Sequence, residues 1–251
     1  MIRKIPAFCF FVLAVYATAA AEEYRIDNVV RGVKSTALLL DGKFYSIIED
    51  NGEIVEFDSH KKIFTLIDPS LRIQTQINAA EMRKKITDMQ QKIAGDPKTD
   101  KESFAYFAAN PVFTSESDTA AGRIVLQSRW IDYEITAVPF HDKSSEMYYD
   151  FCDWMCYLNL RINPFSSAVL TRLTVNRLLR EEKKFPVSVS VAIYPKGKQG
   201  FSKPDKAESS HKIVRRFSEP ERKQIGQINE LKQKFPQVSF EEYQKQVAGK
   251  K

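Results

Sequence analysis

The first part of the chain alternates short apolar runs with polar turns, and this pattern predicts an antiparallel meander over residues 24–77. Asp41-Gly42 and Asn51-Gly52 separate runs that are rich in β-branched and aromatic residues. Both dipeptides tolerate the positive φ angles of a tight hairpin. At residues 71–77, largely apolar positions alternate with arginine and glutamine. That period of two predicts a strand with one buried face and one solvated face.

Helical spacing begins at Asn78, which is a suitable N-cap because Glu81 follows three positions later. The apolar stripe that follows stops at Gly95, which predicts the end of this helix. We also expect a short aromatic helix at residues 103–110.

Two further helices are expected in series, at about 144–160 and 166–182. Asn163-Pro164 separates them, because the residue before a proline avoids the α region. Capping boxes at Ser218 and Ser239 predict two more helices.

Strands are also expected at residues 112–114, within 123–138 and at 185–194. Residues 195–210 are rich in Lys, Gly, Pro and Ser, and we predict a loop there. One more strand is expected at 211–217. The pattern as a whole predicts an α+β fold, in which one curved antiparallel β-sheet, half-barrel in shape, packs against several α-helices.

The N-terminus has the pattern of an export signal. Arg3 and Lys4 precede an apolar run over about residues 5–17, and small residues follow up to Ala21. This order is typical of a cleavable signal peptide, whereas a membrane anchor needs about 20 apolar residues. We therefore predict a signal peptide at residues 1–21 and a periplasmic or secreted protein.

The rest of the chain is expected to form one domain over residues 22–217, with a helical insert at 144–182 and a C-terminal helical tail at 218–251. Removal of the signal peptide lowers the formal net charge from +6 to +4. This mild charge does not indicate nucleic-acid binding.

Basic residues gather between residues 196 and 216. Lys196, Lys198, Arg215 and Arg216 are candidate contacts to an anionic membrane surface. A solvated loop would have the same composition, so both interpretations stay open.

No motif identifies a catalytic centre, a metal site or a cofactor site, and we expect none of the three. His60, His141 and His211 lie far apart and lack metal-ligand spacing. Two S-x-x-K matches, at Ser59 and Ser209, fall in expected turns or loops and lack the partner motifs of serine acyltransferases.

Four polar or reactive side chains lie on the predicted helix at 144–160. Cys152 and Cys156 are four residues apart, which favours two buried thiols over a disulfide. Asp150 and Asp153 could bind a cation or act as an acid–base pair. A solvated helix face explains the two carboxylates equally well.

Aromatic residues gather on two of the predicted helices. On a curved sheet such helices could cover an apolar cavity, or they could simply fill the core. The candidate cavity residues are Phe104, Phe107, Phe151, Trp154 and Met155.

Two segments of the meander, Asp41-Gly42-Lys43-Phe44-Tyr45 and residues 58–68, resemble the LolA/LolB-like lipoprotein-carrier superfamily. Residues 151–159 and 171–176 look like an uncharacterised group of exported bacterial proteins. The superfamily resemblance implies a half-barrel sheet around an apolar cavity, and a lipid or lipoprotein as partner. The helical insert and the tail depart from true carriers, and no functional residue is transferred.

The favoured interpretation is therefore a non-enzymatic envelope protein that binds a hydrophobic or lipid-like ligand. The alternatives are an envelope structural or interaction protein with a filled core, and a hydrolase whose site has no recognisable motif.

Overall fold

The computed structural model describes residues 23–118, 121–141, 145–163, 168–198 and 203–250. Within them, eleven strands form one antiparallel sheet. The strands are β1 (Glu23–Val30), β2 (Val33–Leu40), β3 (Lys43–Ile48), β4 (Ile54–Asp58), β5 (Ile63–Asp68), β6 (Ile73–Asn78), β7 (Thr114–Asp118), β8 (Arg123–Gln127), β9 (Ile131–Pro139), β10 (Lys184–Ile193) and β11 (Asp205–Arg215). The predicted signal peptide lies outside the described residues.

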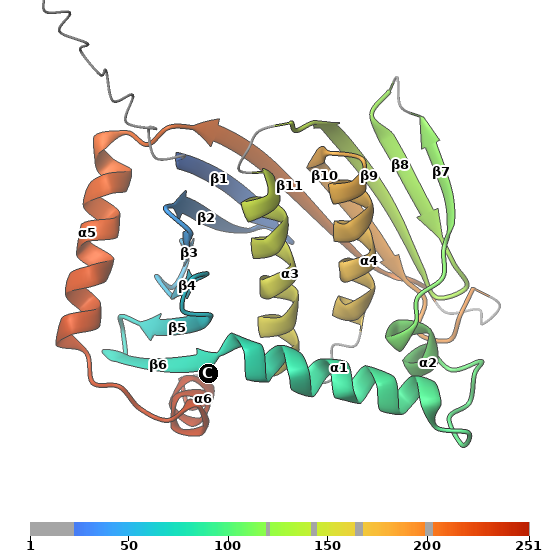
Figure 1. Ribbon diagram of the computed structural model, residues 1–251, viewed down its shortest axis with the longest axis horizontal. Helices are drawn as coiled ribbons and strands as arrows, with labels where there is room; N and C mark the ends of the chain where they lie inside the picture. The colour runs from blue at the N-terminus through green and yellow to red at the C-terminus, as the bar shows by residue number, and fades with distance from the viewer. Residues whose placement is uncertain (1–22, 119–120, 142–144, 164–167, 199–202, 251) are drawn as a thin grey trace, which may run out of the picture.

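Six helices accompany the sheet in the described part of the chain. They are α1 (Ala79–Gly95), α2 (Phe104–Ala109), α3 (Ser145–Ile162), α4 (Ala168–Glu181), α5 (Glu219–Lys234) and α6 (Phe240–Ala248). The strand order is β6-β5-β4-β3-β2-β1-β11-β10-β9-β8-β7. The sheet curves around α3 and α4, and over the described residues it does not close into a barrel (Figure 1). The predicted α+β class with one curved antiparallel sheet is confirmed.

The meander over β1–β6 follows the turn signals of the sequence. At the β2–β3 hairpin, Asp41 has φ 49° and Gly42 has φ 72°, as a type I′ turn requires. A Cβ atom on Gly42 would lie 2.6 Å from His60 Nε2, but the exposed His60 side chain can move away, so the positive φ is what favours glycine here.

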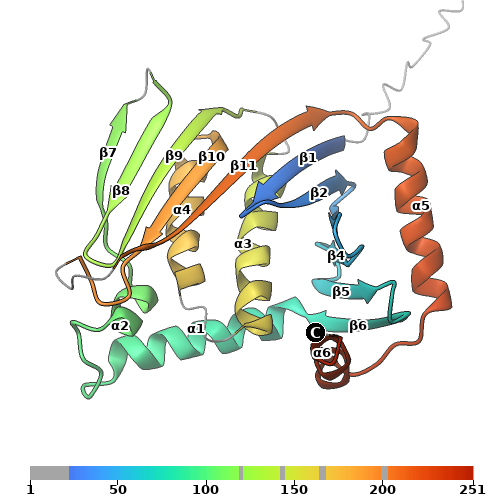
Figure 2. The same ribbon diagram turned by 180° about the vertical axis from the view of Figure 1, so that it is seen from behind.

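Helix α1 connects the two edges of the sheet. It leaves β6, crosses the ends of α3 and α4, and leads through α2 to β7 (Figures 1 and 2). Its N-cap is Asn78, whose side chain accepts a hydrogen bond from the Glu81 backbone N–H. The predicted start of this helix is therefore confirmed.

The concave face of the sheet packs against α3 through aromatic side chains. Phe151 stacks on Phe44 with ring centroids 5.0 Å apart, and Trp154 lies 5.4 Å from Phe57. All four side chains are buried. Much of the concave face is therefore filled by α3 itself.

Helix α5 covers the opposite, convex face of β2–β5. Leu38 and Ile67 from the sheet pack with Ile225 and Ile228 from the helix. Under the same helix, the buried Glu56 forms an ion pair with Lys232, with the nitrogen 2.6 Å from the nearer oxygen.

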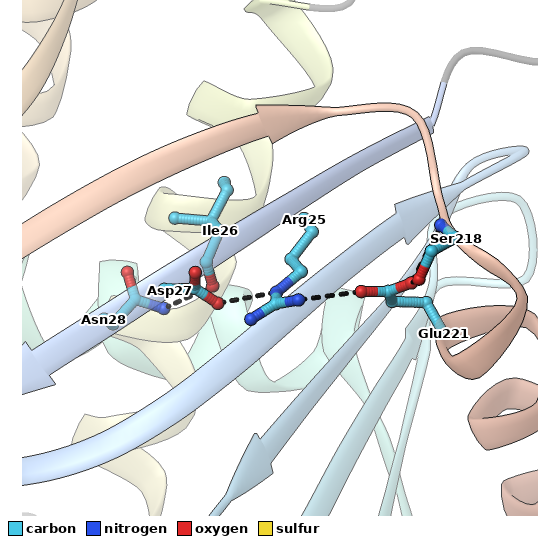
Figure 3. A network of polar contacts seen from close by, with 6 residues as sticks. All are labelled: Arg25, Ile26, Asp27, Asn28, Ser218 and Glu221. Carbon is cyan, nitrogen blue, oxygen red and sulfur yellow. Dashed lines mark hydrogen bonds and ion pairs between the residues drawn. The ribbon is translucent and has the colours of Figure 1, made fainter.

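A polar network holds the N-terminus of α5 on β1 (Figure 3). Arg25 donates to Asp27 at 2.7 Å and to Glu221 at 2.8 Å. Glu221 also accepts from the Ser218 hydroxyl and the Ser218 backbone N–H. The Ser218 hydrogen bond is the main cause that lowers the pKa of Glu221 to about 2, and Arg25 adds to it. The predicted capping box at Ser218 is confirmed.

The prediction of a loop over residues 195–210 is wrong from Asp205 onward. Residues Asp205–Arg215 form β11, which pairs with β1 on one side and β10 on the other. The polar composition of this strand suggested a loop, but two neighbouring strands supply its hydrogen-bond partners. Strand formation here therefore depends on tertiary pairing more than on intrinsic propensity.

The long run predicted within residues 123–138 is two strands rather than one. Ser128 makes the turn between β8 and β9, since its hydroxyl donates to the Ile131 carbonyl and accepts from the Ile131 N–H. The strand expected at residues 112–114 starts only at Thr114.

Candidate functional site

A cleft of about 270 Å³ lies between the concave face of β1 and β11 and the helices α3 and α4. This volume is close to the lower limit of about 300 Å³ for small-molecule sites. Its lining combines an apolar part with a group of polar side chains. The lining residues are Ile26, Asn28, Val30, Tyr148, Phe151, Cys152, Met155, Asn159, Arg172, Asn176, Ser209 and His211.

The strand register explains the sheet side of the cleft. Asn28 pairs with His211 and Val30 pairs with Ser209, and paired residues share one face of the sheet. On α3, Tyr148, Cys152, Met155 and Asn159 follow at intervals of three and four residues, and Phe151 lies beside Cys152, which keeps the lining on one side of the helix. The strand register and the helical period therefore direct these side chains toward the cleft.

His211 lies at the polar end of the cleft, and its two hydrogen bonds fix its tautomer. Its Nδ1 is 2.8 Å from the Asn28 side-chain oxygen, and its Nε2 is 3.0 Å from the Ser209 hydroxyl. Because an amide oxygen only accepts, Nδ1 carries the proton and Nε2 accepts from Ser209. Burial, with a smaller effect from Arg172, lowers the pKa of His211 to about 4. The imidazole is therefore neutral at neutral pH.

Arg172 faces the same cleft from α4. Its Nε donates to the Asn176 side-chain oxygen at 3.1 Å. Asn176 is buried, and its amide nitrogen donates to Asp153 at 2.9 Å. Within the part of the chain that the structure describes, Arg172 forms no ion pair, and its two terminal nitrogens have no hydrogen-bond partner.

The two cysteines are free thiols. Burial raises the pKa of Cys152 to about 11 and that of Cys156 to about 12. Both are therefore protonated at neutral pH, and a protonated thiol is a poor nucleophile. Cys152 lines the cleft as a small, weakly polar side chain.

The five candidate cavity residues lie in three places. Phe151 and Met155 line the cleft. Trp154 faces a separate hollow beside α1, where Lys62 and Arg83 each lie 5.8 Å from its ring centroid. The structure therefore brings only two of the five together in this cleft.

Phe104 and Phe107 are in α2, away from the cleft. Phe104 packs against Trp130 and Phe107 against Phe113, with ring centroids 5.8 Å and 5.5 Å apart. These two side chains attach α2 to the β7–β9 end of the sheet.

The four basic candidates do not form one patch. Lys196 and Lys198 follow β10, while Arg215 and Arg216 lie at the far end of β11 (Figure 1). Lys198 is paired with Asp132 at 2.7 Å. Strand β11, which ends at Arg215, is 11 residues long, so it spans roughly 35 Å at about 3.4 Å per residue.

The remaining sequence candidates have structural partners. Arg180 lies between Asp150 and Asp153, at 2.8 Å and 3.4 Å, so the two carboxylates share a guanidinium. Ser209 and Lys212 lie three residues apart on β11 rather than in the expected loop, which puts them on opposite faces of the sheet. Over the described residues, no group of three His, Cys, Asp or Glu could hold a metal ion.

A larger hollow of about 950 Å³ lies on the other face of β9–β11 and β1. Its lining includes Ser188, Ser190, Glu134 and Lys206, side chains of mixed charge. The concave cleft, by contrast, joins an apolar wall to buried polar groups, as ligand sites commonly do.

Sequence reasoning missed Asn28, Asn176 and Arg172, and it placed His211 without a role. The spacing of four between Arg172 and Asn176 is a weak signal for one helix face. Asn28 and His211 are 183 positions apart, and no local pattern connects them.

Comparison with protein-family models and with curated proteins found no match for this chain. Among the described residues, no helix combines the length and the apolar character needed to cross a bilayer. The fold and the cleft are therefore the basis for assigning a function.

Proposed function

We propose that this protein is an exported, non-enzymatic binding protein that holds a hydrophobic or lipid-like ligand in the cleft between the sheet and α3. The observation that carries the proposal is the cleft itself, on the concave face of an open curved sheet. Its apolar wall is formed by Ile26, Val30, Phe151 and Met155.

Energetics support a chain-like ligand. Each methylene that leaves water contributes about 0.8 kcal/mol, so a short alkyl chain gains useful affinity without any special chemistry. Cys152 is a protonated thiol. The Ser209 hydroxyl does donate to His211 Nε2 in the cleft, but burial lowers the pKa of His211 to about 4, which makes the imidazole a weak general base at neutral pH. These properties favour binding over catalysis.

The architecture supports a relation to the LolA/LolB-like carriers, which the meander segments resemble. An open antiparallel sheet curves around helices on its concave side. In this proposal α3 and α4 occupy much of the space that a carrier would leave for acyl chains. The ligand would accordingly be small.

Binding can be tested with the neutral fluorescent probe N-phenyl-1-naphthylamine and with native mass spectrometry. We expect the wild-type protein to enhance probe fluorescence saturably. Met155→Trp, which fills the cleft, should lower the affinity at least tenfold. Met89→Trp is the matched control, because Met89 is 38% exposed on α1, and it should bind like the wild type.

A second function is favoured by one observation. Phe44, Phe57, Phe151 and Trp154 are packed together in the core, as in a structural or interaction protein with a filled core. Absence of saturable binding by the wild-type protein would contradict the first proposal and support this one. Export is tested by the intact mass of the secreted chain, which should begin at Glu22.

A further inference from the structure

We propose that the cleft selects an anionic amphiphile, and that Arg172 binds its carboxylate or phosphate head group. This inference rests on the proposed function and adds the charge of the ligand. The observation behind it is a guanidinium that lines a partly apolar cleft without a counter-ion among the described residues.

The lining of the cleft carries a single charge among the described residues. Of the twelve lining residues that the structure describes, Arg172 is the one that is charged at neutral pH. Cys152 and Tyr148 are neutral because burial raises the pKa of both, and His211 is neutral because burial lowers its pKa. The cleft therefore has a net charge of one positive unit.

The hydrogen bond of Arg172 orients its guanidinium in the cleft. Asn176 accepts from Nε and fixes the plane of the guanidinium, and Asn176 is itself held by Asp153. The two terminal nitrogens are left for a ligand. A planar fork of N–H donors matches the two oxygens of a carboxylate or phosphate.

Arg180 on the same helix shows by contrast what Arg172 lacks. Arg180, two turns further along α4, contacts Glu146, Asp150 and Asp153. Those three carboxylates balance the charge of Arg180. Arg172 lies next to Asn176 and Asn159 in the lining instead, so a negative charge is missing where the apolar wall begins.

The polar network around His211 completes the head-group end. Asn28 and Ser209 are both bonded to the imidazole, which leaves that wall polar but uncharged. A neutral wall does not compete with Arg172 for an anion. The apolar residues Ile26, Val30 and Phe151 continue the same cleft and would hold the alkyl chain.

The test compares decanoate with decan-1-ol, measured by isothermal titration calorimetry at pH 7.5. Decyl phosphate forms a third arm, because it separates a carboxylate preference from a phosphate preference. We expect the wild-type protein to bind decanoate or decyl phosphate at least tenfold more tightly than decan-1-ol. Arg172→Met should lower the affinity for the anion on the order of ten- to a hundredfold. Its affinity for decan-1-ol should stay within threefold of the wild-type value.

Arg177→Met is the matched control, since Arg177 is exposed on the same helix, and it should behave like the wild type. Arg172→Lys retains the positive charge and should restore part of the anion affinity even if Arg172→Met is less stable. Equal binding of decanoate and decan-1-ol by the wild-type protein would overturn the anion inference while apolar binding stands. If neither compound nor decyl phosphate binds, the proposed function itself fails.

Discussion

The two halves of the sheet bury their surfaces in different ways. In β2–β5 the convex face is covered by α5 and the concave face packs on α3. In β8–β10 the concave face packs toward α4, where the Tyr133 and Thr171 hydroxyls are 2.7 Å apart, while convex residues such as Glu134 and Arg123 are exposed.

The edges repeat this contrast. β6 is covered by the tail, since Gln74 donates to the Pro236 carbonyl and accepts from the Val238 N–H. All residues of β7, at the other edge, are exposed. An exposed edge that carries acidic residues such as Glu116 and Asp118 is disfavoured as a template for aggregation. Equivalent side chains should therefore contribute differently to the free energy of unfolding in the two halves.

The largest expected effect is on core packing. Phe57 is fully buried between Phe64 and Trp154, and Phe57→Ala should lower the free energy of unfolding by about 3–5 kcal/mol. Phe107 is half-buried at the other end of the sheet, so Phe107→Ala should cost less than half as much. Urea denaturation of both variants measures the difference, and equal costs would contradict the comparison.

This contrast also explains which parts of the fold the sequence predicts. The meander was predictable because Asp41-Gly42 fixes a hairpin locally. Strand β11 was not, because Ser209, Ser210 and Lys212 have loop-like composition and become a strand only between β1 and β10. Local chemistry identifies turns and caps, whereas pairing between distant segments depends on the whole chain.

The candidate site was less predictable than the fold for the same reason. Phe151 and Met155 were found because they share a helix face with other apolar residues. Arg172 and Asn28 could not be found, because their role depends on α4 meeting β1 across the cleft. Aromatic content also misled in part, since Phe104 and Phe107 attach α2 and do not reach the cleft.

Ion pairs in the two halves should also contribute differently to stability. Lys232 neutralises the buried Glu56 under α5, where the Glu56 side chain is 3% exposed. Lys232→Met leaves that carboxylate buried without a partner and should cost about 3 kcal/mol, the low end for a broken buried pair, because the Lys232 side chain is 25% exposed. Arg123 and Glu134 form a pair on the solvated face, with side chains 53% and 58% exposed.

Arg123→Met should therefore change the stability by less than about 1 kcal/mol. Thermal and chemical denaturation at low and at high salt will separate the two cases. Salt should have little influence on the Lys232 effect and should reduce any Arg123 effect. A cost for Arg123→Met that equals the cost for Lys232→Met would show that α5 does not exclude water from Glu56.

A smaller effect than that of Lys232→Met is expected at β11, the strand that joins the two halves. His211 has a pKa of about 4 in the folded protein and about 6.5 in an unfolded chain. Between these values the unfolded chain binds more protons, so stability is full above pH 6.5 and falls as the pH drops toward 4. The loss should be on the order of 1–2 kcal/mol at pH 5.

His211→Asn isolates this contribution, because its amide can still donate to Asn28 and does not titrate. Arg172 is the charged group facing His211 in the cleft. Carboxylates that titrate at lower pH, such as Glu221 with its pKa of about 2, are present in both proteins. Their contributions cancel in the stability difference between wild type and variant. Urea curves at pH 7, 6 and 5 should diverge for the wild type and the variant. Parallel curves would mean that water reaches His211, and that the polar end of the cleft is open rather than closed between the two halves.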